Sequence, residues 1–298
     1  MDTLSYNDYK PVQLSDKPLL MDIFSRLDPL PCEYVFANLI MWGKIYDARY
    51  AIYKNALVIR TGLDKCLLMP VGNTFSPQEL KDMLMAAFPD DKEDCTIIQV
   101  PDEYINQNIA VNDIFDIEKD IDFADYIYST EKLYLLRGSK LAKKKNLLSQ
   151  FTRNYPGYVC APLETSVFEE CSALAEKWCE DKTCKLIGIT HEKSAMSEAF
   201  KLFRELELDG LYITVNGKIV AFSIFSFQNS ETAVVHFEKY DKEFKGAAQA
   251  INWETAKYLL GRTKIINREQ DIGLPGLRKA KQSYDPDKLL LNNILSLK

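Results

Sequence analysis

The chain has 298 residues, of which 47% are hydrophobic and 27% are charged. These fractions are typical of a folded globular protein and exclude a disordered chain, and the length is sufficient for two domains of ordinary size. The formal net charge of -6 predicts no bulk attraction to nucleic acid, DNA included, or to anionic lipid, so any anion must bind at a local basic patch.

Seven cysteines are scattered along the chain without the CxxC or Cys/His spacing of a metal site. Their odd number and their spacing predict reduced, mostly buried thiols, a cytoplasmic location and no bound metal. The polar N-terminal sequence does not resemble a signal peptide, and no apolar run approaches the roughly 20 residues of a membrane span.

The first part of the chain, residues 1–124, shows alternating helix and strand signals. Strand patterns on both sides of Lys54-Asn55 predict a β-hairpin. Ser76, followed by Pro77 and Glu79, predicts a capped helix start. A further helix is expected at 15–27, a buried helix or a helix–strand junction at 34–47, and further strands at 66–72, 96–101 and 110–117.

A basic segment follows the acidic first part, and we place the boundary between domains 1–124 and 125–298 there. Six basic residues with no acid among them lie on an expected helix: Arg137, Lys140, Lys143, Lys144, Lys145 and Arg153. One interpretation is a solvated cationic face. The other is a surface that binds the phosphates of an anionic substrate or RNA, which the acidic background favours.

The second half contains a strand, a turn and a helix in succession. Asn216-Gly217 between two alternating segments predicts a hairpin, and its second strand is expected to pair with the strand that carries His236 and Glu238. A small-residue turn at 242–248 precedes an amphipathic helix at 250–260. This order presents backbone N–H groups and a positive helix end to an anion.

The turn resembles the pyrophosphate-binding element of the GNAT acyltransferases, with Gly246 and Ala248 at the small-residue positions and Ala247 between them. Glu243 departs from that motif, because a carboxylate stands where a cation or an amide is expected, and this disfavours acyl-CoA. Glycine and alanine at this spacing are also common at helix starts in general. If the turn binds phosphate, Gly246→Asp should abolish donor binding with little loss of stability.

The C-terminal sequence GLRKAKQSYDPDKLL resembles a run near the end of the phosphatidylglycerol lysyltransferase C-terminal domain. The matching residues are Arg278, Lys281, Tyr284 and Pro286. This resemblance implies an α+β, mixed-sheet fold of two tandem GNAT-like domains. It also implies a relation to the Fem-type peptidyltransferases, which take amino acids from aminoacyl-tRNA.

Aminoacyl transfer requires a base, a stabilised oxyanion and an acid for the leaving group. His236 and Glu238, on one face of their strand, stand where a GNAT-type base would lie; the alternative is a pair of strand residues whose hydrogen bonds are satisfied by their neighbours. Glu269 is a further catalytic candidate, and the resemblance places Tyr284 where a leaving-group acid is often found.

Other polar residues are assigned to binding. Asn267 and Asp271 are expected to hold the substrate, with Asp271 and Glu269 facing an ammonium group. Arg278 and Lys281, three residues apart on a helix, are expected to bind a donor phosphate together with the Lys143–Lys145 run.

No serine–histidine–acid, metal or P-loop pattern is visible in the sequence, which disfavours hydrolase, zinc-enzyme and NTPase functions. The sequence therefore predicts an acyl or aminoacyl transferase with an anionic donor, aminoacyl-tRNA by resemblance, and a small-molecule or peptide acceptor. The alternatives are an acyl-CoA N-acyltransferase and a catalytically silent module that binds an anionic metabolite. No cofactor is predicted with certainty.

Overall fold

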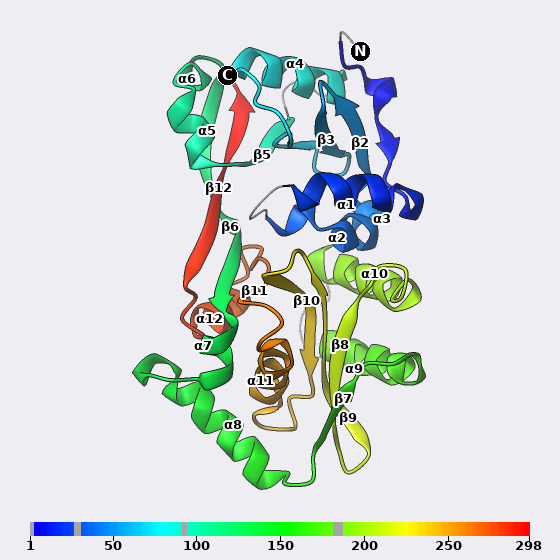
Figure 1. The fold of residues 1–298 in the computed structure, drawn as a ribbon, viewed down its shortest axis with the longest axis vertical. Helices are drawn as coiled ribbons and strands as arrows, with labels where there is room; N and C mark the ends of the chain where they lie inside the picture. The colour runs from blue at the N-terminus through cyan, green and yellow to red at the C-terminus, as the bar shows by residue number, and fades with distance from the viewer. Residues whose placement is uncertain (1–2, 27–30, 91–93, 181–186) are drawn as a thin grey trace. The chain divides into compact units, whose positions relative to one another are not determined.

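The computed structural model describes residues 3–26, 31–90, 94–180 and 187–298 (Figure 1). The chain divides into two compact units, residues 1–124 with 290–298 and residues 125–289. Strand β6 (Phe115–Ser129) carries the chain into the second unit and β12 (Lys288–Leu297) returns it to the first. The sequence-based division had kept residues 290–298 with the second domain. None of the helices among the described residues is long and apolar enough to cross a bilayer.

The first unit contains a mixed sheet in the strand order β1-β2-β3-β4-β5-β12. Most neighbours are antiparallel, but β4 and β5 are parallel and α4 connects them. The new strands are β1 (Lys10–Pro11), β2 (Ala48–Tyr53), β3 (Ala56–Thr61), β4 (Cys66–Leu68) and β5 (Thr96–Val100). The helices are α1 (Lys17–Ser25), α2 (Phe36–Met41), α3 (Gly43–Tyr46), α4 (Pro77–Ala87), α5 (Asp102–Gln107) and α6 (Val111–Ile114).

Local sequence signals of the first unit act as expected. Lys54 and Asn55 have φ values of 47° and 62°, as a tight hairpin turn requires. The Ser76 hydroxyl accepts from the Glu79 N–H, and the Glu79 carboxylate accepts from the Ser76 N–H at 2.9 Å, so the predicted capping box is confirmed.

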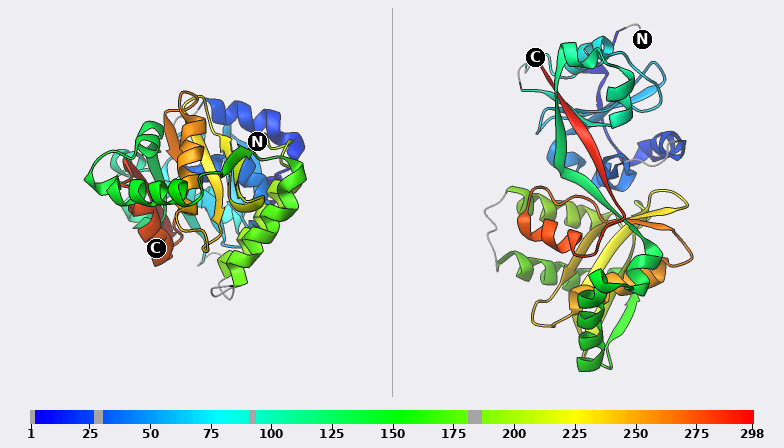
Figure 2. Two further views of the ribbon diagram at one scale, coloured as in Figure 1. Left: turned by 90° about the horizontal axis from the view of Figure 1, so that it is seen from below. Right: turned by 90° about the vertical axis from the view of Figure 1, so that its left-hand side faces the viewer.

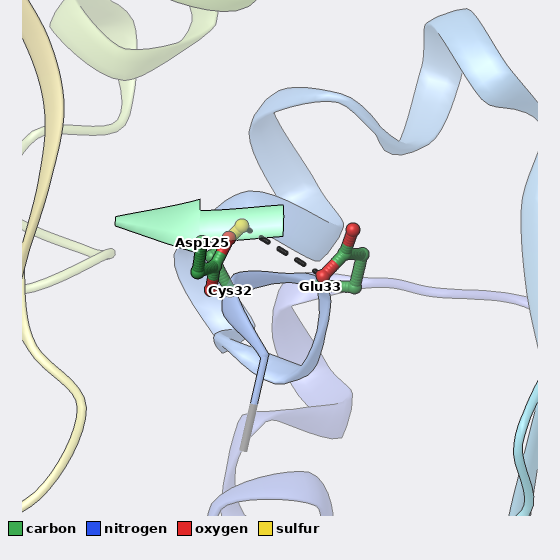
Figure 3. Close-up of side chains that lie close together, drawn as sticks. All are labelled: Cys32, Glu33 and Asp125. Atoms are coloured by element: carbon green, nitrogen blue, oxygen red, sulfur yellow. Dashed lines mark hydrogen bonds between the residues drawn. The ribbon is translucent and has the colours of Figure 1, made fainter. Parts of the chain in front are cut away.

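Glu33 is held by polar neighbours in the same unit, since the Cys32 thiol donates to its Oε2 at 3.7 Å (Figure 3) and Gln99 Nε2 donates to its Oε1 at 2.7 Å.

The second unit contains the strand order β6-β11-β10-β9-β8-β7. All neighbours are antiparallel except β10 and β11, which are parallel and connected by α11. The strands are β7 (Val159–Pro162), β8 (Asp209–Val215), β9 (Lys218–Phe227), β10 (Thr232–Tyr240) and β11 (Ile265–Asn267). The helices are α7 (Thr130–Leu135), α8 (Ala142–Asn154), α9 (Phe168–Glu180), α10 (Ile187–Lys201), α11 (Ala247–Leu259) and α12 (Pro275–Gln282).

Helices cover both faces of this second sheet. The ring of Phe225 on β9 lies 5.7 Å from that of Tyr258 on α11, whereas the ring of Phe222 lies 6.0 Å from that of Phe200 on α10. Because residues three apart on a strand point to opposite faces, α11 and α10 pack on opposite sides. Helix α8 lies beside α11 and packs against it (Figures 1 and 2).

The parallel pairing of β10 with β11 is short. It covers Thr232 to Val234 on β10 and ends at Asn267 on β11, although β10 continues to Tyr240. The two segments therefore separate beyond this point. We call residues 235–240, after the paired part of β10, and residues 268–271, after β11, the fork. The polar residues that the sequence singled out lie at or near this fork.

Candidate active site

A β-bulge at His236 decides how the side chains of the fork are distributed. Val235 is opposite Phe225 of β9, but Phe237 is opposite the next residue, Ile224, so His236 is the extra residue. Glu238 is then opposite Ser223, whose hydroxyl lies 2.6 Å from the Thr255 hydroxyl on α11. Glu238 therefore faces α11.

His236 lies on the other side of the sheet. Its Nε2 is 2.8 Å from the hydroxyl of Ser226, and Ser226 alternates with Phe225, which faces α11. The expectation that His236 and Glu238 share one strand face is wrong, because the bulge inserts one residue into the alternation.

The imidazole of His236 is held at both nitrogens. Its Nδ1 lies 2.8 Å from Glu269 Oε1, and its Nε2 lies 2.8 Å from the Ser226 hydroxyl. The His236 side chain is fully buried, whereas 18% of the Glu269 side chain is exposed. The carboxylate of Glu269 is thus the more accessible member of this pair, and the imidazole orients it.

A serine, a histidine and a glutamate are therefore linked by hydrogen bonds in that order. The three residues are separated along the chain, so the sequence does not show the arrangement. Ser226 is on β9, His236 on β10 and Glu269 in the loop after β11. Ser226 is 95% buried and lies within a paired strand, so its hydroxyl is not presented as an attacking nucleophile is in hydrolases. We assign the serine to fixing the imidazole.

On the α11 side of the fork, Glu238 forms the centre of a second cluster. Arg268 Nη2 donates to its Oε1 at 2.9 Å, and Asn252 Nδ2 on α11 donates to its Oε2 at 3.2 Å. Burial opposes the charge of Arg268, but Glu238 and the neighbouring tyrosines offset that effect, and the pKa of Arg268 lies above its ordinary value. Arg268 remains a cation in a buried site.

Tyr284 is part of the same cluster. The centroid of its ring lies 4.9 Å from Arg268 Cζ and 4.1 Å from Lys144 Nζ. Its hydroxyl is buried without a hydrogen bond of normal geometry, and the Gln249 side chain is near it. Burial raises the pKa of Tyr284 above its ordinary value, so the hydroxyl retains its proton at neutral pH.

The basic helix α8 contributes one lysine to this cluster. Lys144 is half-buried, whereas Lys143 and Lys145 are exposed to solvent. Burial, together with repulsion from Arg268, lowers the pKa of Lys144 to about 8. The environment of Lys144 thus differs from that of its two neighbours in the run.

Asp271 and Arg278 bind each other. Arg278 Nε and Nη2 donate to the two oxygens of Asp271 at 2.8 Å each, and the Tyr126 hydroxyl donates to Asp271 Oδ2 at 2.6 Å. Burial alone would raise the pKa of Asp271, but these donors more than offset it and hold the pKa below its usual value. Because the carboxylate is fully buried and occupied, it does not present a site for a substrate ammonium.

Lys281 and Asn267 also make internal bonds. Lys281 Nζ donates to the Arg268 carbonyl at 2.6 Å and to the Gln270 carbonyl. Asn267 Nδ2 donates to Asp125 Oδ2 at 2.7 Å, and its side-chain oxygen accepts from the Glu269 N–H at 2.8 Å. Lys281 and Asn267 thus hold the loop that carries Arg268 and Glu269 in place, and we assign these two residues a structural role at the fork.

The turn before α11 is packed against α8. Gly246 has a φ of 91°, and a Cβ there would lie 2.5 Å from the Leu147 carbonyl oxygen and 2.9 Å from Phe151 Cβ. Ala247 is fully buried and Ala248 is half-buried. This packing accounts for the glycine and contradicts the expectation that Gly246→Asp costs little stability.

Glu243 does not carry an isolated negative charge at this turn. Its side chain is 69% exposed and lies 3.1 Å from Lys177 Nζ. A solvated, paired carboxylate repels a phosphate weakly, so Glu243 is a poorer argument against acyl-CoA than the sequence suggested. The packing of α8 on Gly246 is the more direct obstacle to ligand approach at that residue.

Sequence reasoning did not single out Arg268, Asn252 or Ser226. Arg268 directly precedes Glu269 in the loop after a strand, so the signal that selected Glu269 applied equally to it. Asn252 and Ser226 lie within a helix and a strand, and only the tertiary contacts identify them.

Residues 24–291 match the family model described as phosphatidylglycerol lysyltransferase, C-terminal. The chain belongs to this family. Because the match covers most of the chain, family membership includes both units and the whole fork.

Solved structures agree with the family. A conserved protein of unknown function from Bacteroides thetaiotaomicron is 33% identical, with coverage of 97% of this chain and 99% of that one and a TM-score of 0.88. The structure of L-PGS from Bacillus licheniformis is 16% identical over 94% of this chain and 91% of that one, with a TM-score of 0.63. A tandem GNAT protein from the clavulanic acid biosynthesis pathway is 10% identical over 97% of this chain and 98% of that one, with a TM-score of 0.52.

These likenesses confirm the predicted α+β, tandem GNAT-like fold. An uncharacterised protein of Mycoplasmoides gallisepticum is 22% identical over 170 residues, which span 56% of this chain and 54% of that protein. The chain thus matches about half the length of this curated relative. Family and fold together support a GNAT-like transferase of the lysyl or aminoacyl type.

Proposed function

We propose that this protein transfers an aminoacyl group from aminoacyl-tRNA to an amine or hydroxyl of a small-molecule or peptide acceptor, with the reaction at the fork. The observation that carries the proposal is the Glu269–His236 pair at 2.8 Å, at the point where two parallel strands separate, in a member of this family. A partly exposed carboxylate held by a buried imidazole is suited to accept a proton from an attacking group.

The proposed reaction joins the acceptor nitrogen or oxygen to the carbonyl carbon of the aminoacyl ester and breaks the bond to the tRNA ribose oxygen. Glu269 takes the proton that the acceptor loses. The departing ribose oxygen needs a proton, and we assign its delivery to Glu269, which has just taken one from the acceptor, because the Tyr284 hydroxyl is buried beside Arg268 and Lys144 on the α11 side of the fork. Glu238 is already bonded to Arg268 and Asn252, so we assign it to orienting Arg268.

Transfer from a mixture of radiolabelled aminoacyl-tRNAs to a panel of amines, peptides and hydroxyl compounds tests this function. We expect Glu269→Gln to lower the transfer rate by about 10² to 10⁴-fold, the usual effect of removing a general base. Glu231→Gln is the matched control, since Glu231 is exposed and is paired with Lys264 near the opposite end of β10.

Acetyl-CoA is tested separately with the same acceptors. Micromolar affinity for acetyl-CoA, together with acetylation of amines, would identify acyl-CoA rather than aminoacyl-tRNA as the donor. Transfer from neither donor would favour a binding module without catalysis. Equal rates for the Glu269→Gln and wild-type proteins would remove Glu269 from the role of base.

A further inference from the structure

Buried polar atoms without partners gather on the α11 side of the fork. Three buried side-chain polar atoms of this cluster lack a hydrogen-bond partner of normal geometry: Arg268 Nη1, the Tyr284 hydroxyl and Asn252 Oδ1. Native proteins leave few such atoms, and each one calls for an explanation such as a bound water or ligand. Their concentration around Glu238 makes this cluster the candidate place for a bound water or ligand.

The charges of the cluster indicate the sign of that molecule. Lys144 and Arg268 both lie within 5 Å of the Tyr284 ring centroid, and Arg268 is hydrogen-bonded to a single carboxylate, that of Glu238. Lys144 lies over the Tyr284 ring, and within the described part of the chain no ion pair or hydrogen bond to Lys144 is found. Two cations with one carboxylate leave a net positive charge in a partly buried place, which an anion would neutralise.

Hydrogen-bonding capacity indicates the chemical class. Arg268 Nη1 and Lys144 Nζ can only donate, and the protonated Tyr284 hydroxyl can donate as well. A phosphate group offers several acceptor oxygens and no obligatory donor, and a guanidinium binds it with good geometry. The unpartnered Asn252 Oδ1, on a residue bonded to the same Glu238, suits a hydroxyl group next to that phosphate.

We infer that Arg268, Lys144 and Tyr284 form a subsite for a nucleotide phosphate of the donor. This inference rests on the proposed function, and it names the part of the donor that the α11 side of the fork recognises. Lys144 is the member of the Lys143–Lys145 run that contributes. The lowered pKa of Lys144 is consistent with a cation that lacks its anionic partner.

Calorimetric titration with adenosine 5′-monophosphate at constant ionic strength tests the subsite, with no acceptor present and no transfer required. A failure of this experiment is therefore distinct from a failure of transfer. We expect Lys144→Met to weaken binding by about tenfold or more, the loss expected for one charge-assisted hydrogen bond. Lys144→Arg should retain binding, because it keeps the charge and the donors.

Lys145→Met is the matched control, since it removes the same charge from an exposed neighbour on α8. An equal loss in Lys145→Met and Lys144→Met would overturn the subsite in favour of general attraction to the helix. Circular dichroism and melting temperatures verify that each variant is folded.

Adenosine, inorganic phosphate and glycerol 3-phosphate complete the experiment. We expect adenosine to bind at least tenfold more weakly than adenosine 5′-monophosphate, because it lacks the phosphate, a loss of about 1.4 kcal/mol. Absence of binding by every phosphate compound would overturn the proposal. Tighter binding of glycerol 3-phosphate than of the nucleotide would also overturn it, since the site would then recognise a phospholipid head group.

Discussion

Replacing Gly246 by alanine adds one methyl group where the turn before α11 meets α8. The new Cβ would lie 2.5 Å from the Leu147 carbonyl oxygen and 2.9 Å from Phe151 Cβ. Both distances are shorter than the 3.0 Å that a Cβ keeps from heavy atoms to which it is not bonded. The carbonyl belongs to the backbone of α8, so no side-chain rotation can relieve that contact. The helix itself has to move.

Two contributions set the expected loss of stability. The backbone at Gly246 has a φ of 91°, and a left-handed conformation costs an L-residue about 1–2 kcal/mol. Overpacking of a filled interior costs about 1–3 kcal/mol more. We therefore expect Gly246→Ala to lower the free energy of unfolding by about 2–5 kcal/mol, a large part of the 5–15 kcal/mol of a typical domain.

Urea unfolding followed by far-ultraviolet circular dichroism measures this loss. Gly261→Ala is the control, because Gly261 also has a positive φ, 80°, but a Cβ there meets no heavy atom within 4 Å. The control should show only the backbone contribution of about 1–2 kcal/mol. Equal losses in the two variants would refute the argument that contact with α8 is what requires glycine at this turn.

Other perturbations test other parts of the structure. Ser76→Ala should lower the free energy of unfolding by about 1 kcal/mol in chemical denaturation, because it removes the cap of α4, and an unchanged value would exclude that role. Asp271→Asn should cost about 3 kcal/mol, since it leaves the Arg278 guanidinium without its counter-charge, and Arg278→Met in the same background should then cost little more. Lys144 has a folded-state pKa of about 8, below its ordinary 10.5, so the folded protein releases this proton first and its stability rises with pH between those values. The stability of Lys144→Met relative to wild type should therefore fall across that window, and a constant difference would show that Lys144 titrates normally.

Local sequence patterns determined the turns, the helix start and the strand–turn–helix order. The hairpin at Asn216-Gly217 forms because both residues tolerate positive φ, with values of 50° and 80°. The cap at Ser76 and Glu79 forms because its donors and acceptors are within one turn of the chain. Such features depend on neighbours in sequence, and a single sequence therefore predicts them.

Which residues form the candidate site depended on contacts between residues far apart in the sequence. The extra residue at His236 reverses strand alternation, and nothing in the letters of β10 indicates a bulge. Arg278 and Asp271 were expected to bind ligand, yet the fold brings them within hydrogen-bond distance of each other and so commits them to the loop. Arg268 gains its position only when α11, α8 and the loop after β11 assemble around Glu238 and Tyr284.

The sequence by itself thus determined which segments carry chemistry, because residue type, periodicity and turn signals are properties of the chain. Tertiary structure alone decided which polar groups are satisfied by one another. A carboxylate that is bonded to a guanidinium no longer presents its charge to a substrate. A buried guanidinium nitrogen without an acceptor still offers its N–H groups to a ligand. Pairing of this kind is set by three-dimensional distance, and it separates the supporting residues Asp271, Arg278 and Lys281 from the ligand-facing candidates Arg268 and Lys144.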